Sequence, residues 1–81
     1  SDLTYPSAAK PTIRESDAGP LVSYAQGVLA LRAGQPLEVS GSFDQRTVEA
    51  VRSLQTYVGL VPTGVIDAPT WTAIDNLAGG S

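Results

Sequence analysis

The sequence predicts an all-α fold, a compact bundle of three helices in which a loop followed by a helix occurs twice. Three observations predict it: apolar residues recur at helical spacing in three segments, helix-capping residues precede those segments, and one set of residues recurs 23 positions later, as from Gly41 to Gly64. The chain has 81 residues, enough for one small core, so we expect a single domain.

The first predicted helix begins after residue 18, where apolar residues recur every three or four positions. Its apolar face consists of Val22, Ala25, Leu29 and Ala33. Ser16 and Asp17 are candidate N-caps, and Pro20 suits a first turn because its φ is already close to the helical value. Gly34 is expected to end the helix, and the alternating apolar residues at 37–39 allow a short strand after it.

The second helix is expected after Asp44, whose carboxylate can accept a hydrogen bond from the amide of Thr47, and Gly59 is expected to end it. Asp67 is expected to begin a third, shorter helix with Pro69 in its first turn. The predicted core faces are Thr47, Val48, Val51, Leu54, Gln55 and Val58 in the second helix, and Trp71, Ile74 and Leu77 in the third.

The two junctions between loop and helix match residue by residue. A glycine turns the chain, an apolar residue two positions later anchors the loop, and an aspartate caps the helix that follows. The matching series are Gly41, Phe43, Asp44, Thr47, Val48, Ala50, Val51 and Leu54, and Gly64, Ile66, Asp67, Thr70, Trp71, Ala73, Ile74 and Leu77. Turn geometry and capping account for each position, so the repeat indicates architecture before function.

The composition argues against several classes of function. The chain contains neither Cys nor His, so we expect no metal, no cofactor and no catalytic residues. A net charge of −3 with only 5 Lys and Arg leaves no basic stripe for nucleic acid. No apolar run approaches the roughly 18 to 20 residues that cross a bilayer, so no membrane partner is expected. Asp44 and Asp67 could suggest paired carboxylates for glycoside cleavage, but their cap positions account for both.

Three motifs together carry a family resemblance from about Pro11 to Leu77. The first is Ile13-Arg14, Ser16-Asp17, Gly19-Pro20, Val22, Ala25-Gln26 and Leu29; the second is Gly41-Ser42-Phe43, Thr47, Ala50-Val51 and Leu54-Gln55; the third is Gly59-Leu60, Thr63-Gly64-Val65, Thr70-Trp71 and Leu77. They resemble the three-helix peptidoglycan-binding domains of bacterial and phage cell-wall hydrolases. Asp44 and Asp67 stand where that family often has glycine, and Ser40 and Thr63 where an aspartate commonly precedes the turn glycine.

The resemblance implies a non-catalytic module that binds peptidoglycan, through its glycan strand or its stem peptide, and targets an attached hydrolase or phage endolysin. It implies a covalently linked catalytic domain in the parent chain and a location in the cell wall, the periplasm or outside the cell, and we expect a monomer. Residues 12–78 would form the domain, 1–11 an extended lead-in or linker, and 79–81 a C-terminal linker or tag residue.

A second class of function stays open. The related fold covers active sites in matrix metalloproteinase zymogens, so the chain could be a protein–protein interaction or pro-domain-like module of a larger secreted protein. The cysteine switch used in those zymogens requires a thiol, and this chain has no Cys.

Six residues are candidates for ligand binding: Tyr24, Tyr57, Arg14, Arg46, Gln26 and Gln55. Aromatic rings stack on sugar faces, and arginine binds carboxylates of a stem peptide. Both tyrosines lie beside the predicted core faces rather than within them, whereas Trp71 lies within one and is expected in the core. Each candidate also has a structural interpretation, because buried glutamines can tie loops to helices and surface arginines can serve solubility.

Overall fold

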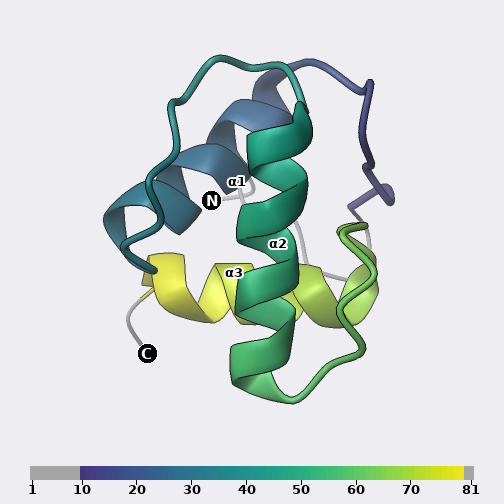
Figure 1. The fold of residues 1–81 in the computed structure, drawn as a ribbon, viewed down its shortest axis with the longest axis vertical. Coiled ribbons are helices and arrows are strands. Elements are labelled where there is room, and N and C mark those ends of the chain that lie inside the picture. The colour runs from purple at the N-terminus through teal and green to yellow at the C-terminus, as the bar shows by residue number, and fades with distance from the viewer. Residues whose placement is uncertain (1–9, 80–81) are drawn as a thin grey trace, which may run out of the picture.

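The computed structural model describes residues 10–79, and that part of the chain contains three helices, α1 (Pro20–Leu31), α2 (Gln45–Val58) and α3 (Ala68–Gly79). The all-α prediction is confirmed. Helix α2 lies in front of α1 and α3 in Figure 1, and α1 packs against both other helices. Residues 1–9 and 80–81 lie outside the described part, and with them most of the predicted lead-in and C-terminal linker.

One core joins the three helices and the loops between them. It consists of Ile13, Val22, Ala25, Val28, Leu29, Phe43, Ala50, Val51, Leu54, Ile66, Trp71 and Ile74. The predicted core face of α2 is wrong at its last residue, since Val58 is 43% exposed. Figure 1 shows the final turn of α2 extending past α3, so this end of the helix is only partly covered.

Helix α1 begins without the predicted side-chain cap. Gly19 is the N-cap residue, and no side chain accepts a hydrogen bond from the first turn. The carboxylate of Asp17 instead accepts from the backbone amide of Arg14 at 2.8 Å, and the Asp17 amide donates to the Arg14 carbonyl at 3.0 Å. The cap prediction for Ser16 and Asp17 is therefore wrong, because Asp17 closes a separate turn before the helix.

Helices α2 and α3 have the predicted aspartate caps. Asp44 Oδ1 accepts from the amide of Thr47 at 3.0 Å and from its hydroxyl at 2.9 Å. Asp67 Oδ1 accepts from the amide of Thr70 at 3.4 Å and from its hydroxyl at 2.9 Å. The hydrogen bond from the Thr47 amide, and secondly that from the Thr47 hydroxyl, lowers the pKa of Asp44. Gly59 ends α2 in the left-handed conformation, as predicted.

A buried glutamine of α1 holds the loop that leads into α2. Gln26 Nε2 donates to the Ser42 carbonyl at 2.8 Å and to the Thr47 hydroxyl at 2.9 Å. Its Oε1 accepts from the backbone amides of Ser40 at 3.0 Å and Gly41 at 2.8 Å. These contacts, here called the Gln26 network, satisfy the buried amide and fix the loop.

A glutamine of α2 does the same for the loop that leads into α3. Gln55 Nε2 donates to the carbonyl of Val65 at 2.9 Å and to the hydroxyls of Thr70 at 3.0 Å and Thr63 at 3.2 Å, while its Oε1 accepts from the amide of Gly64 at 2.9 Å. Each partner atom in this Gln55 network lies 23 positions after a matching atom that contacts Gln26, including the Ser40 hydroxyl, which accepts from Gln26 Nε2 at 3.4 Å. The sequence repeat is therefore also a repeat of hydrogen bonds.

Both networks depend on glycine at the turn. Gly41 and Gly64 have φ values of 84° and 80°, which side-chain-bearing residues rarely adopt. A Cβ at Gly64 would lie 2.9 Å from Val48 Cγ1, and one at Gly41 would lie 3.0 Å from Ser23 Oγ. The backbone conformation and the close packing therefore both favour glycine.

The segment before α1 connects the two repeats. Ile13 and Ile66 exchange two backbone hydrogen bonds of 3.1 and 2.9 Å, and the Phe43 amide donates to the Asp17 carbonyl at 2.9 Å. Figure 1 shows this segment descending to meet the loop between α2 and α3. Within residues 10–79 the only β pairing consists of such isolated bridges. Residues 37–39 do not form the strand allowed by their alternation, because they have no pairing partner there.

Candidate functional site

A groove runs along α2 on the side of the α1–α2 loop. Its N-terminal half has a volume of about 400 Å³, and its C-terminal half has about 490 Å³. Gln35 and Ser53 line both hollows, so the two adjoin, and we call the pair the α2 groove. The N-terminal half is further lined by Gln45, Arg46 and Glu49, and the C-terminal half by Arg32, Leu54, Tyr57, Val58 and Leu77. The charged residues Arg46 and Glu49 therefore lie in the N-terminal half, and the larger apolar side chains line the C-terminal half.

The α2 groove brings together two of the six predicted site residues, Arg46 and Tyr57. Both are exposed, and Tyr57 is 87% exposed despite its large ring. They lie eleven residues apart on one helix, which corresponds to about 16 Å along its axis. A cation and an aromatic ring thus stand at opposite ends of the α2 groove, each in its own hollow.

Further charged and polar residues of this groove were not predicted. Glu49 and Ser53 continue the spacing of three or four residues from Arg46 to Tyr57, so a helical wheel could have identified that face. Arg32 and Gln35 belong to the end of α1 and the loop beyond it. No local pattern indicates that this loop folds against α2, so their place could not be read from the sequence.

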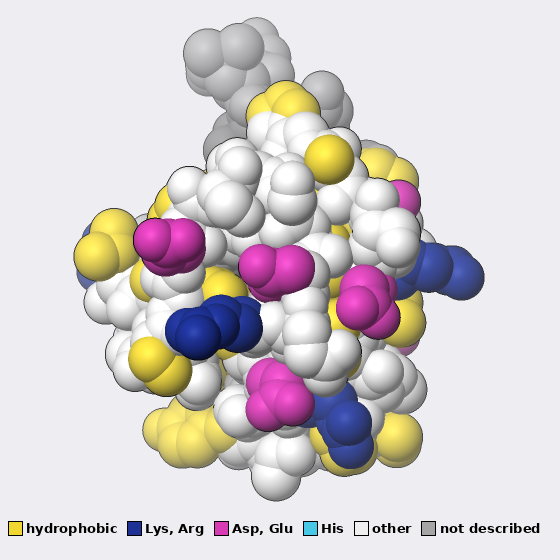
Figure 2. Space-filling view, turned by 45° about the horizontal axis from the view of Figure 1, so that its top comes forward, with side chains coloured by type: hydrophobic (Ala, Val, Ile, Leu, Met, Phe, Trp, Pro, Cys, Tyr) yellow, Lys and Arg dark blue, Asp and Glu magenta, His cyan; other side chains and the backbone are white. Residues whose placement is uncertain are grey.

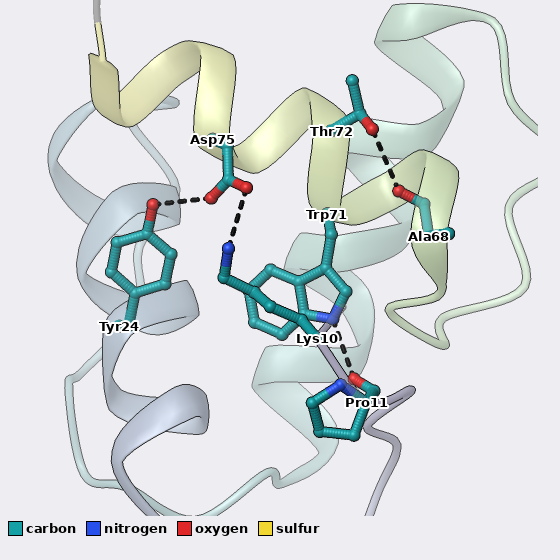
Figure 3. Close-up of polar contacts among 7 residues, drawn as sticks. All are labelled: Lys10, Pro11, Tyr24, Ala68, Trp71, Thr72 and Asp75. Carbon is teal, nitrogen blue, oxygen red and sulfur yellow. Dashed lines mark hydrogen bonds and ion pairs between the residues drawn. The ribbon is translucent and has the colours of Figure 1, made fainter. Parts of the chain in front are cut away.

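Tyr24 lies on a different surface, between α1 and α3. Figure 3 shows its hydroxyl directed at Asp75, to which it donates a hydrogen bond of 2.8 Å, and its ring stacks on Trp71 with centroids 6.1 Å apart. Lys10 Nζ lies 2.9 Å from the other oxygen of Asp75 and 5.5 Å from the centroid of the Trp71 ring. We call these four residues the Lys10 clamp.

The Lys10 clamp attaches the N-terminal segment to the helices. The Lys10 side chain is only 7% exposed, and Trp71 Nε1 donates to the Pro11 carbonyl at 2.9 Å. Trp71 is fully buried, which confirms its predicted place in the core. Lys10 and Pro11 contact α3 although they fall within the predicted lead-in, and the proposed domain boundary at residue 12 stays a prediction. Periodicity could not indicate this contact, because 65 positions separate Lys10 from Asp75.

The remaining candidates lie outside the α2 groove. Gln26 and Gln55 are buried, and their amides are occupied in the two networks described above, which favours their structural interpretation. Arg14 is exposed at the turn closed by Asp17. Of the six, only Arg46 and Tyr57 share a groove.

The environment of Tyr24 predicts a loss of stability at alkaline pH. Burial, followed by the hydrogen bond to Asp75 and the charge of that carboxylate, raises the pKa of Tyr24 from 10.0 to about 12. Because the folded state holds the phenol proton more tightly, this contribution is complete below pH 10 and is lost as the pH rises through about 12. We expect the unfolding free energy of the wild type to fall more steeply across this window than that of Tyr24→Phe.

Chemical denaturation at several pH values would measure this difference, since Tyr24→Phe keeps Lys10 and Asp75 and removes only the ionisable hydroxyl. Equal pH dependence of the two proteins would contradict the assignment. An absorbance titration of the phenols, compared between the same two proteins, reports the pKa of Tyr24 directly.

The charged surface is mixed in sign. Figure 2 shows acidic and basic side chains interspersed across one face, with uncharged and hydrophobic surface between them. Within residues 10–79, no group of three or more acidic side chains could hold a metal ion, and no helix is long and apolar enough to cross a membrane. Recognition on such a surface depends on individual groups rather than on a field of one sign.

Comparison with known proteins identifies relatives. The family model described as "Putative peptidoglycan binding domain" matches residues 18–74. A Kitasatospora aureofaciens protein, named only as an uncharacterized protein in the bpoA1 3' region, is 34% identical over 71 residues, which are 85% of this chain and 59% of that protein. The chain thus spans less than two thirds of the length of this relative.

Solved structures show the same fold. A peptidoglycan-binding protein from Clostridioides difficile, in complex with glutamine hydroxamate, has a TM-score of 0.79 and 34% identity, covering 83% of this chain and 42% of that one. The endolysin of Burkholderia phage AP3 has a TM-score of 0.76 and 33% identity, covering 89% and 26%.

A third structure shows the fold alone. It is a periplasmic domain of the EpsAB fusion protein of the Vibrio vulnificus type II secretion system, with a TM-score of 0.78 at 15% identity, covering 90% of this chain and 33% of that one. The family match spans most of the three-helix unit and agrees with the three motifs of the sequence. The chain belongs to the family of peptidoglycan-binding domains.

Proposed function

We propose that this chain is a non-catalytic module that binds peptidoglycan through the α2 groove and thereby targets an attached cell-wall hydrolase to its substrate. One observation carries the assignment to this groove: within a member of this family, an exposed arginine and an exposed aromatic ring line two adjoining hollows along α2. The proposal places the parent protein in the cell wall, the periplasm or outside the cell.

The chemistry of the groove suits a polymer of sugars and short peptides. The Tyr57 ring can pack on an apolar sugar face or side chain, and the Arg46 guanidinium can form paired hydrogen bonds with a carboxylate. Gln35 and Ser53, between them, add neutral hydrogen-bonding groups. Every one of these contacts is open to water, so each contributes little and several must act together.

A binding role agrees with how the acidic residues are used. The carboxylates of Asp44 and Asp67 accept hydrogen bonds at the starts of α2 and α3, so both serve the fold. The chain also matches only 26% of a phage endolysin, which supports a module that is one part of a larger hydrolase. Weak attachment would raise the local concentration of the linked enzyme at its substrate.

Sedimentation with insoluble peptidoglycan tests the proposal. We expect the wild-type chain to pellet with peptidoglycan, and Tyr57→Ala and Arg46→Ala each to weaken binding by about 5-fold, because a ring contact or an exposed charged contact contributes roughly 1 kcal/mol. Leu31→Ala, which also removes an exposed large apolar group, and Arg14→Ala are matched controls outside the groove.

Circular dichroism should show that all four variants remain folded. A wild-type chain left in the supernatant would overturn the proposed function and favour the protein-interaction alternative. Equal losses of peptidoglycan binding in the groove variants and the controls would instead show that the binding surface does not lie in the α2 groove.

A further inference from the structure

The order of charges along the α2 groove favours one part of peptidoglycan. Arg46 stands at one end, Glu49 follows one turn later on the same helix, and Arg32 lines the half that contains Tyr57. All three charged side chains are exposed. A ligand that matches this order presents an anion, then a cation, then a second anion beside an apolar group.

Arg46 is available to such a ligand. Within residues 10–79 its guanidinium forms no hydrogen bond and no ion pair, although its charge contributes to lowering the pKa of nearby Asp44, whose carboxylate caps α2. Glu49 accepts one long contact of 3.4 Å from Gln45 Nε2, which leaves its other oxygen open to a donor. The groove thus carries a donor fork and a carboxylate side by side.

On the basis of the proposed function, we infer that the α2 groove binds the stem peptide of peptidoglycan in an extended form and not the glycan strand. The terminal carboxylate of the peptide lies at Arg46, and the side-chain amine of its diamino residue lies at Glu49. The carboxylate of the second residue faces Arg32, and the end joined to the sugar packs on Tyr57.

The dimensions agree with this placement. Arg46 and Tyr57 lie about 16 Å apart along the helix, and four extended residues span about 13 to 14 Å, which leaves room for the group joined to the sugar. A glycan strand would fit the groove less well. It has few formal charges, so it would displace water from Arg46 and Glu49 without replacing those interactions, and a single aromatic ring lines the groove as a stacking surface.

Titration of the complete chain with defined probes tests the inference. The probes are the tetrapeptide L-Ala–D-Glu–L-Lys–D-Ala, its C-terminal amide, its Nε-acetyl form, and a chito-oligosaccharide without peptide. We expect the free tetrapeptide to shift the NMR signals of groove residues and the oligosaccharide to leave them unchanged. Amidation and acetylation should each weaken wild-type binding by about 5- to 10-fold.

Paired variants identify which group each charge contacts. In Arg46→Gln the amide and the free acid should bind equally, and in Glu49→Gln the acetylated and free amines should bind equally, because the protein partner has already been removed. Arg14→Gln, a matched arginine outside the groove, should retain both discriminations. Persistence of the amide effect in Arg46→Gln would overturn the placement.

Sedimentation of the same preparation with peptidoglycan separates the two proposals. If the chain pellets but the tetrapeptide causes no shift, or the oligosaccharide shifts the groove residues, the stem-peptide inference fails and the binding function stands. If the chain does not pellet at all, the proposed function itself fails.

Discussion

Replacement of Gln55 by leucine is expected to lower the free energy of unfolding by about 3 kcal/mol. The side chain is 1% exposed, and its amide serves the Val65 carbonyl, the Gly64 amide and two threonine hydroxyls. Leucine has a similar volume but can neither donate nor accept, so the buried Gly64 amide loses its partner and the Val65 carbonyl keeps only a 3.5 Å contact from the Thr63 hydroxyl. The Thr70 hydroxyl keeps its bond to Asp67. Each unpaired buried group costs about 1 to 3 kcal/mol, and water reaching the exposed Thr63 limits the total.

Urea denaturation followed by circular dichroism measures this loss. Gln45→Leu is the matched control, because Gln45 is an exposed glutamine of the same helix, and its replacement should change stability by less than about 0.5 kcal/mol. Gln26→Leu should behave like Gln55→Leu but more mildly, since the Gly41 turn is less buried than the Gly64 turn. Equal stability of Gln55→Leu and Gln45→Leu would show that the Gln55 network does not stabilise the fold.

Truncation of Trp71 to alanine is expected to cost about 4 kcal/mol. Trp71 is the largest fully buried side chain, and its ring contacts Tyr24 from α1 and the Lys10 side chain from the N-terminal segment. Removal of the ring leaves a cavity where α1, α3 and that segment meet. A domain of this size has a total stability of only about 5 kcal/mol, so Trp71→Ala should be close to unfolded at room temperature.

Trp71→Phe is a milder substitution at the same position. It keeps an aromatic ring but loses the bond to the Pro11 carbonyl and part of the volume, so we expect a loss of about 2 kcal/mol. Tyr57→Ala also truncates an aromatic ring, but the 87% exposed side chain should matter by less than about 0.5 kcal/mol. A loss at Tyr57 as large as that at Trp71 would contradict the assignment of the core.

The features that could be predicted from the sequence are those that arise within a few residues. Asp44 caps α2 through Thr47, three positions later, and the turn at Gly64 needs a positive φ, so both leave a local pattern. The predicted cap of α1 was wrong because the Asp17 carboxylate could accept a hydrogen bond either from the first turn of α1 or from the Arg14 amide. The sequence alone does not show that it bonds to Arg14. The choice between them depends on how residues 13–19 pair with the two loops.

The candidate site was harder to predict because part of it depends on contacts between residues that are far apart in the sequence. Arg46 and Tyr57 follow from residue type and helical spacing, but the half of the groove formed by Arg32 and Gln35 exists only because a loop folds against α2. The attachment of Lys10 to Asp75 likewise joins the two ends of the described chain. Tertiary contacts of this kind have no period in the sequence.

The arrangement shared by the Gln26 and Gln55 networks is not repeated on α3. In each network, a glutamine of one helix holds the loop that leads into the next helix, first between α1 and α2 and then between α2 and α3. The position of α3 that corresponds to Gln55, 23 residues later, is Ala78. Its methyl group can neither donate nor accept a hydrogen bond, so α3 has no side chain at this position that could hold a following loop as Gln26 and Gln55 do.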